Sequence, residues 1–185
     1  MWADQKDPYN KKKYPAGVHG DKGYKRITEF GTQLLSKQKL RFYYGDIRES
    51  QFKIIFKKAK KKKGDTGENI IGLLESRLDS FVYRTRFVST MFAARQFVSH
   101  RHVLVNDKIV NIPSYILKPG DAIKIKKKSL HFATILEAKN KIRDIPEYIK
   151  VNDQGISTYL EVPKLLNVPY NMELETNDIV EFYSR

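Results

Sequence analysis

The amino-acid sequence predicts an α+β fold, in which several helices precede a small antiparallel sheet. Apolar residues recur at helical spacing from Thr28 to Arg84, and the spacing changes to that of short strands from Val103 onward. Asn106 and Asp107 separate two of these strands, and both residue types tolerate the left-handed conformation of a tight hairpin turn. A chain of 185 residues, 41% of them hydrophobic, can form one or two domains with a buried core.

Two helices are expected in the first third of the chain. Thr28 can cap the first, which should end near Tyr44 because Gly45 follows. The second should span residues 49–63. The apolar residues at helical spacing, which should face the core, are Phe30, Leu34 and Leu35 on the first helix and Phe52, Ile55, Phe56 and Ala59 on the second.

Two further helices are expected before the sheet. Asp65 and Glu68 have the spacing of a capping box, which opens a helix that continues to about Arg84. Ser89 can cap a shorter helix over residues 90–99. The residues expected to face inward are Ile70, Ile71, Leu74, Leu78, Phe81 and Val82 on the longer helix, and Phe92 or Ala93, Phe97 and Val98 on the shorter one.

Short strands are expected on both sides of a further helix at residues 131–140. These strands are residues 103–105, 108–110, 123–125, 149–152, 158–161 and 179–183. Residues 1–26, in contrast, contain Pro, Gly and Lys at a density that opposes regular structure. We expect an irregular basic arm there, which is either a disordered tail or a segment that becomes ordered against RNA phosphates.

The charge of the chain points to a polyanionic partner. There are 35 Lys and Arg against 21 Asp and Glu, a net charge of +14. The excess is +10 in residues 1–70 and +7 in residues 71–140, whereas residues 141–185 carry −3. This balance fits nucleic acid or, less often, an anionic membrane. The acidic last part can face solvent or a basic protein neighbour.

The sequence contains no motif typical of catalysis or of metal binding. The chain has no cysteine, and its four histidines lack the spacing of a metal site. Neither a Gly-rich phosphate loop nor a nucleophile elbow is present. We therefore expect no catalytic residue, no metal and no cofactor. No apolar run approaches the roughly 20 residues of a membrane span, so no membrane partner is expected.

The helix that begins near Ser89 and Thr90 is the main candidate for binding. Free backbone N–H groups at a helix start suit phosphate, and Arg95, Arg101 and Lys108 can flank such a site. Two alternatives stay open for neighbouring residues. The histidines at 100 and 102 contact RNA or form local structural hydrogen bonds, and the tyrosines at 43, 44 and 83 stack on bases or pack in the interior.

Basic and polar side chains across the first two-thirds of the chain form the full set of candidate RNA contacts. They are Lys11, Lys12, Lys13, His19, Lys37, Lys39, Arg41, Tyr44, Lys60, Lys61, Lys62, Arg77, Arg84, Ser89, Thr90, Arg95, Gln96, His100, Arg101, His102, Asn106, Lys108 and Lys118. Most would meet the sugar–phosphate backbone, so the expected binding depends on RNA shape rather than on base sequence.

Residues 77–125 resemble the alpha-L RNA-binding domain. The matching residues are Arg77-Leu78-Asp79, Ala94, Phe97, His100, Val105-Asn106, Val110, Pro113 and Gly120-Asp121-Ala122-Ile123. The flanking segments resemble the bacterial-type S4 family of small-subunit ribosomal proteins. These segments are YPAGVHG at 14–20, FGTQLLSKQKLRFYYG at 30–45, QFKIIF at 51–56, GDTGENIIGLLESRLD at 64–79, IPSYILKPGD at 112–121 and IVEFYSR at 179–185.

The resemblance implies a helical domain into which the alpha-L domain is inserted. The expected divisions are a basic arm at 1–26, a helical domain at 27–76 plus 174–185, and the inserted domain with its later strands at 77–173. The last residues should return beside the N-terminal helices. The resemblance also implies a structural protein of the small ribosomal subunit. It would bind small-subunit rRNA early in assembly, at a junction in the 5′ domain near the mRNA entrance, and influence decoding accuracy.

The partners implied are small-subunit rRNA, neighbouring ribosomal proteins and mRNA at the entrance. The alternatives are an RNA-modifying enzyme that uses the same domain, or a regulator that represses its own message. The segment TMFAARQ with SHRHVLVN looks closest to alphaproteobacterial forms, and Lys, Ile and Asn are plentiful. On these grounds a mitochondrial matrix is favoured over a bacterial cytoplasm or a plastid stroma.

The chain departs from the family pattern at several positions. It has no Cys for the zinc knuckle that many relatives carry. Glycines common in the family are replaced by Arg86, Arg101 and Asp107, and an arginine often found early in the second helix of the inserted domain is Met91. The family's contacts are therefore carried over least securely at Met91 and Arg101.

Overall fold

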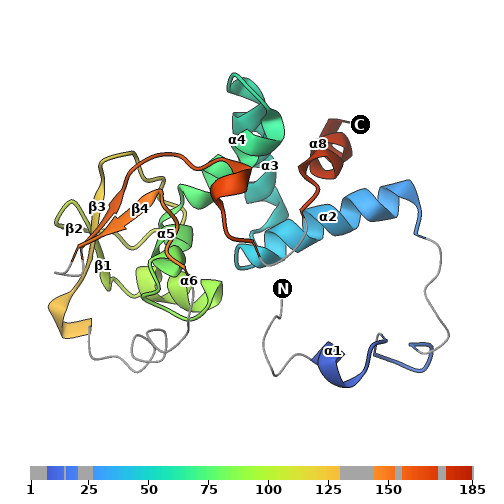
Figure 1. Ribbon diagram of the computed structural model, residues 1–185, viewed down its shortest axis with the longest axis horizontal. Coiled ribbons are helices and arrows are strands. Elements are labelled where there is room, and N and C mark those ends of the chain that lie inside the picture. The colour runs from blue at the N-terminus through green and yellow to red at the C-terminus, as the bar shows by residue number, and fades with distance from the viewer. Residues whose placement is uncertain are drawn as a thin grey trace. The chain divides into compact units, whose positions relative to one another are not determined.

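The computed structural model describes residues 8–14, 16–20, 27–129, 144–152, 156–170 and 174–184, and Figure 1 shows the order of its elements. The chain forms two compact units, one of residues 1–40 with 170–185 and the other of residues 41–169. The fold class is α+β, as expected. The units divide the chain at other points than the domain limits expected at 76 and 174, because the helices of residues 49–75 group with the sheet-containing part.

The smaller unit contains α1 (Pro8–Lys11), α2 (Glu29–Tyr43) as far as Leu40, and α8 (Thr176–Ser184). The short helix α1 lies in the arm that was expected to be irregular throughout. Thr28 caps α2 as expected, since its Oγ1 accepts a hydrogen bond from the Gly31 N–H at 3.1 Å. The expected core face of α2 is wrong. Leu35 is exposed and Phe30 half exposed, whereas the buried residues are Gln33, Lys37 and Leu40.

The C-terminal segment is helix α8, and the strand expected at residues 179–183 is wrong. Its contacts explain the helix. Ser36 donates to Asp178 at 2.7 Å, Gln33 donates to Glu181 at 2.9 Å, and the rings of Phe30 and Phe182 lie 5.5 Å apart. Positions 178, 181 and 182 share one face only at helical spacing. The expected return of these residues to the first long helix is confirmed.

The larger unit begins with α3 (Glu49–Lys61) and α4 (Thr66–Glu75), which pack against each other. The expected core face of α3 is confirmed, because all four apolar residues expected there are buried. The expected cap of α4 is also confirmed, since the Asp65 carboxylate accepts from the Glu68 N–H at 2.7 Å. Gly72 lets α4 approach the later chain closely, because a Cβ there would lie 2.7 Å from Val162.

The single helix expected from Asp65 to about Arg84 is wrong, because the structure has two helices there. After α4 ends, Arg77 is extended, and α5 (Leu78–Arg84) begins. The break lets the backbone pair with a distant segment. The Leu117 N–H donates to the Ser76 carbonyl and the Leu78 N–H donates to the Tyr115 carbonyl, both at 2.8 Å. All the apolar residues expected to face inward on these helices are buried.

Helix α6 (Met91–Ser99) is capped one residue later than expected. The Thr90 hydroxyl, not that of Ser89, accepts a hydrogen bond from the Ala93 N–H at 3.1 Å. Burial of Phe97 and Val98 confirms the expected inward face, but Phe92 is exposed, and Ala94 takes the buried position beside it.

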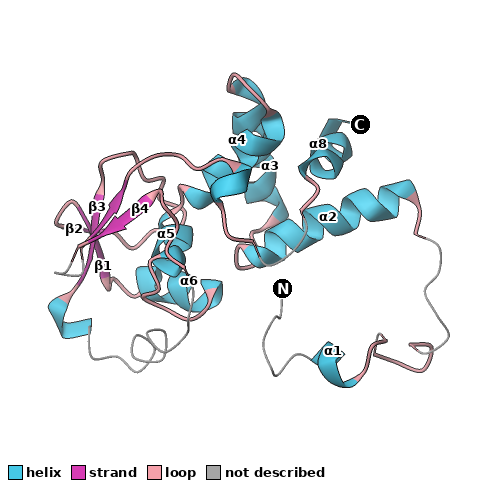
Figure 2. Ribbon diagram, in the orientation of Figure 1, coloured by secondary structure: helices cyan, strands magenta, loops and turns pink. Residues whose placement is uncertain are grey.

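An antiparallel sheet follows, with the strand order β2-β1-β3-β5-β4 within the described residues. The strands are β1 (Val103–Val105), β2 (Lys108–Ile109), β3 (Ala122–Ile125), β4 (Ile149–Val151) and β5 (Ser157–Tyr159). The predicted hairpin is confirmed, because Asn106 and Asp107 have φ angles of 49° and 64°. The sheet packs on the helices through Phe81 and Tyr159, whose rings lie 5.9 Å apart. Figure 2 shows the strands of the sheet beside α5 and α6.

Two short helical turns complete the larger unit, η1 (Lys127–Ser129) after β3 and η2 (Leu165–Asn167) after β5. The helix expected at residues 131–140 lies outside the described residues. No helix in the described part of the chain is long and apolar enough to cross a membrane.

Candidate nucleic-acid interface

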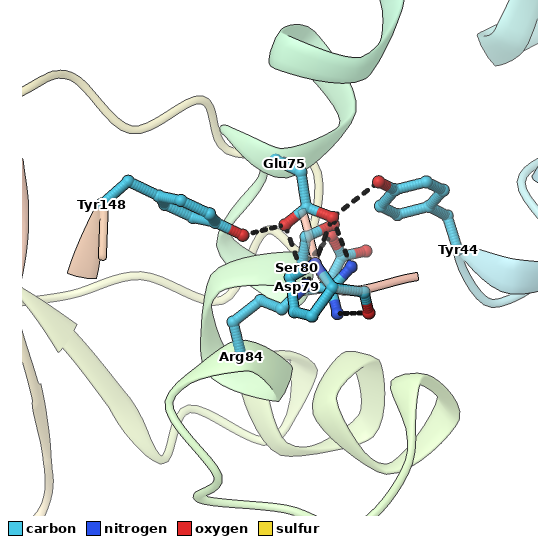
Figure 3. Close-up of polar contacts among 7 residues, drawn as sticks. Tyr44, Glu75, Asp79, Ser80, Arg84 and Tyr148 are labelled. Atoms are coloured by element: carbon cyan, nitrogen blue, oxygen red, sulfur yellow. Dashed lines mark hydrogen bonds and ion pairs between the residues drawn. The ribbon is translucent and has the colours of Figure 1, made fainter. Parts of the chain in front are cut away.

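Arg84, one of the expected RNA contacts, lies in the interior of the larger unit. Its guanidinium forms an ion pair with Glu75, with Nη2 at 2.7 Å from Oε1. Tyr44 and Tyr148 donate their hydroxyl groups to the same carboxylate at 2.6 and 2.8 Å, so the pair receives hydrogen bonds from two sides (Figure 3). Arg84 also donates to the Pro169 carbonyl at 3.3 Å.

This network changes the protonation equilibria of its members. Burial raises the pKa of Glu75, but Arg84 and the hydrogen bonds outweigh it and leave the pKa below its usual range. Burial raises the pKa of the neighbouring Tyr43 to about 12, although Arg84 opposes that change. Because Arg84 and Tyr44 both bind the buried Glu75 carboxylate, neither is kept among the proposed RNA contacts. For Tyr44, interior packing is the alternative that the structure favours.

Arg77, the first residue of the Arg-Leu-Asp motif, is also buried. Its Nε donates to Asp79 Oδ1 at 2.9 Å and its Nη2 to Oδ2, a bidentate pair. Asp79 in turn accepts a hydrogen bond from the Ser80 N–H at 2.9 Å, which satisfies a free donor in the first turn of α5. The motif thus holds the junction between α4 and α5, and Arg77 is not available to phosphate.

Two basic residues of α2, Lys37 and Arg41, also contact groups within the protein. Lys37 is buried, and its ammonium lies 4.0 Å from the centroid of the Phe182 ring, a cation–π contact. Arg41 donates to the Ile47 carbonyl at 2.7 Å and pairs with Glu49 at 3.1 Å. The expected role in RNA binding does not fit Lys37, and Arg41 is largely neutralised. Lys39 is exposed as expected.

The end of α3 is an exposed cationic surface. Its opposite face is buried, which forces the lysines of residues 57–63 to point into solvent. None of these lysines forms an ion pair within the described part of the chain. They include Lys60, Lys61 and Lys62 of the expected set. The arm residues Lys11, Lys12, Lys13 and His19, and the loop residues Lys108 and Lys118, are exposed as well.

The start of α6 offers backbone N–H donors, as expected. Fewer basic side chains are free to flank it than the sequence predicted. Thr90 is exposed and Ser89 half-buried, and Gln96 is exposed one and a half turns later. Arg95 is half-buried and lies 3.5 Å from the Gly45 carbonyl. At the other end of the helix, His100 and Arg101 are exposed in the turn that leads to β1.

His102 and Asn106, two of the expected RNA contacts, lie at the sheet and form hydrogen bonds within the protein. His102 Nδ1 lies 2.9 Å from the Ser129 hydroxyl, and its ring lies 4.7 Å from that of Phe97. The Asn106 amide donates to Asp121 at 2.8 Å and accepts from the Ala122 N–H at 2.9 Å, which joins the hairpin to β3. Burial, followed by His100 and Lys126, holds the pKa of His102 below its usual value. For His102 the structure therefore favours a local structural hydrogen bond over RNA contact. Asn106 also forms hydrogen bonds within the protein.

Sequence reasoning missed the lysines of η1. Lys127 and Lys128 are exposed and lie outside the expected set, although the run IKKK at 125–128 is visible in the sequence. In the described residues no group of acidic or histidine side chains has the arrangement of a metal site.

Two family models match adjoining segments of the chain, and curated relatives align along its whole length. The family described as "Ribosomal protein S4/S9 N-terminal domain" matches residues 2–75, and the "S4 domain" family matches residues 76–123. Curated proteins named small ribosomal subunit protein uS4 from Rhizobium meliloti, Brucella suis and Sinorhizobium medicae are each 51% identical over 187 aligned positions. The alignment covers all of this chain and 91% of each relative.

The chain belongs to the uS4 family. This confirms the resemblance stated from the sequence, and the S4 domain match at 76–123 agrees with the segment expected to be the RNA-binding domain. The relatives come from alphaproteobacteria, as that resemblance suggested. They are bacterial, so they give no support to the preference for a mitochondrial compartment.

Proposed function

We propose that this protein is a structural constituent of the small ribosomal subunit and binds small-subunit rRNA chiefly through the sugar–phosphate backbone. The observation that carries the proposal is the 51% identity to uS4 proteins along the whole chain. The net charge of +14 and the unpaired lysines at the end of α3 support it. Backbone contacts of this kind fix the position of RNA without reading its sequence.

The proposed contact surface follows those members of the expected set that are exposed or half-buried and that are not assigned above to contacts within the protein. It comprises Lys11, Lys12, Lys13, His19, Lys39, Lys60, Lys61, Lys62, Ser89, Thr90, Arg95, Gln96, His100, Arg101, Lys108 and Lys118. Lysines at the end of α3 act as point charges toward phosphate, and the start of α6 supplies backbone N–H groups. The buried arginines at 77 and 84 are left out, because each already pairs with a carboxylate.

Sedimentation tests the proposal directly. We expect the tagged chain to co-sediment with small subunits after a high-salt wash, and to bind a transcript of the 5′ domain of small-subunit rRNA. The logarithm of the affinity should fall with the logarithm of salt by roughly 0.7 to 0.9 per phosphate contact. A chain that stays in the supernatant, or an affinity that does not change with salt, would contradict the proposal.

The finer parts of the proposal need separate experiments. We place the protein early in subunit assembly, beside neighbouring ribosomal proteins and the mRNA entrance, with an influence on decoding accuracy. A depleted strain should accumulate small-subunit precursors and misread a reporter codon. We also propose that the chain has no enzymatic activity. An RNA-modifying enzyme is the competing function, and turnover of an RNA substrate by the purified chain would favour it.

The competing regulatory function, repression of its own message, uses the same RNA surface. It predicts specific binding to the leader of that message in competition with rRNA. The preference for a mitochondrial matrix also remains a prediction. Fractionation of the source cells with an antibody against this chain separates a mitochondrial ribosome from a bacterial or plastid one.

A further inference from the structure

We infer that the turn between α6 and β1, together with η1, forms a second phosphate-binding surface that holds an RNA strand by adjacent phosphates. This turn–η1 cluster consists of the exposed residues His100, Arg101, Lys127 and Lys128, together with the half-buried Lys126. The inference rests on the proposed function, and it assigns RNA contact to three lysines that the sequence did not single out.

The two segments are held together by short contacts. The Lys126 N–H donates to the His102 carbonyl at 3.0 Å, and His102 Nδ1 lies 2.9 Å from the Ser129 hydroxyl. Val103 pairs with Ile125 in the sheet just beyond. Two segments 24 or more residues apart in sequence therefore have a fixed relative position, and the cluster is preorganised.

The exposed members of the cluster carry positive charge that no carboxylate of the described residues neutralises. His100, Arg101, Lys127 and Lys128 are exposed, and none of them forms an ion pair within the described part of the chain. The next lysine on β3 differs, because Lys124 pairs with Asp107 at 2.7 Å. An unneutralised group of this kind attracts the phosphates of a nucleic acid, and Arg binds phosphate through two parallel hydrogen bonds.

Arg101 has a left-handed backbone conformation and an exposed side chain. Its φ angle is 64°, in the region that costs a residue with a side chain about 1–2 kcal/mol. The half-buried Arg86 has a similar φ angle of 62°, so what favours phosphate binding at Arg101 is its exposed guanidinium.

The experiment measures binding of the full chain to the 5′-domain transcript with the substitutions Lys127→Gln and Lys128→Gln combined. Each lost contact should lower the affinity about five- to eightfold at 0.1 M salt, so the double variant should bind roughly 25- to 60-fold more weakly. The matched control is Lys164→Gln, an exposed lysine just before η2, which should bind like the unaltered chain.

One further variant separates the parts of the inference. Arg101→Gly should weaken RNA binding without lowering the free energy of unfolding, because glycine suits the backbone at this position. Equal RNA affinity of this variant and the unaltered chain would overturn the role of Arg101.

The outcomes distinguish this inference from the proposed function. If the unaltered chain fails to bind the transcript, the proposed function fails. If it binds, but the double lysine variant has the same affinity and salt dependence as Lys164→Gln, then the turn–η1 cluster is a solvated surface and the inference alone is wrong.

Discussion

The junction between α4 and α5 and the turn–η1 cluster are both rich in basic residues, yet they use them in opposite ways. At the junction, Arg77 and Arg84 are buried, and each faces a carboxylate from its own neighbourhood, Asp79 and Glu75. In the cluster, Arg101 is exposed and no described carboxylate pairs with it. The comparison teaches that the number of basic residues does not identify an RNA surface. The position of nearby carboxylates does.

The two regions should also respond differently to mutation. An arginine buried with its carboxylate cannot be removed without leaving a charge in the interior, whereas an exposed arginine loses only contacts with a partner. Stability should therefore depend on the junction, and the salt dependence of RNA binding should depend on the cluster. The predictions that follow test this separation.

The largest effect is expected from Arg84→Met. Among the described residues, the variant leaves the buried Glu75 carboxylate with the hydroxyl groups of Tyr44 and Tyr148 as its side-chain partners. We expect the free energy of unfolding to fall by about 3–5 kcal/mol, the usual cost of breaking a buried pair. Urea unfolding followed by circular dichroism measures this loss.

The comparison fails if Arg84 acts mainly on RNA. In that case Arg84→Met would keep its stability, and the salt slope of its RNA binding would fall by roughly 0.7 to 0.9. The matched control is Arg101→Met, which removes an exposed guanidinium and should change stability by less than about 0.5 kcal/mol.

A smaller effect is expected from acid. The pKa of Glu75 lies lower in the folded chain than its ordinary value of 4.5, so the unfolded chain binds the proton more readily. The stability that Glu75 contributes is complete above pH 4.5 and is lost as the pH falls below it. Urea unfolding at a series of pH values from 6 down to about 3 measures this loss.

Glu75→Gln is the control for the acid series. It cannot titrate, so the variant should be less stable than the unaltered chain at pH 6, and the difference should shrink toward pH 3. A constant difference across the series would mean that the pKa of Glu75 is the same in the folded and the unfolded chain.

Local features of the fold could be predicted from the sequence because their determinants lie within a few residues. Thr28 and Asp65 cap helices through bonds to residues three positions later, and the hairpin depends on Asn106 and Asp107 alone. The buried face of α3 follows from spacing in one segment. The fold class and the family could be predicted for the same reason, because short motifs along the chain indicate both.

The features that failed depend on partners far away in the sequence. The break after Ser76 needs Tyr115 and Leu117, and the helical state of α8 follows from contacts with Gln33 and Ser36. Nor does the sequence show that Arg84 is internal, because its carboxylate is nine residues earlier and receives hydroxyl groups from residues 44 and 148. A candidate RNA surface based on residue type therefore included residues of the core.

The smallest effect concerns the positions where the family pattern has glycine. Arg86 and Arg101 have φ angles of 62° and 64°, and both resemble glycine positions in conformation. The left-handed cost of about 1–2 kcal/mol, less about 0.5–1 kcal/mol for the greater freedom of glycine in the unfolded chain, predicts a gain of up to about 1.5 kcal/mol for each Arg→Gly substitution. Thermal unfolding of the two single variants measures it.

The same two variants then sharpen the comparison of buried and exposed arginines. Arg86 is half-buried with its Nε unpaired, and its Nη2 lies 3.8 Å from Asp144, so Arg86→Gly should gain stability and keep RNA affinity. Arg101→Gly should gain similar stability and bind the transcript more weakly, with a salt slope reduced by roughly 0.7 to 0.9. Equal affinities for the two variants would show that exposure and missing carboxylates do not suffice to identify an RNA contact in this chain.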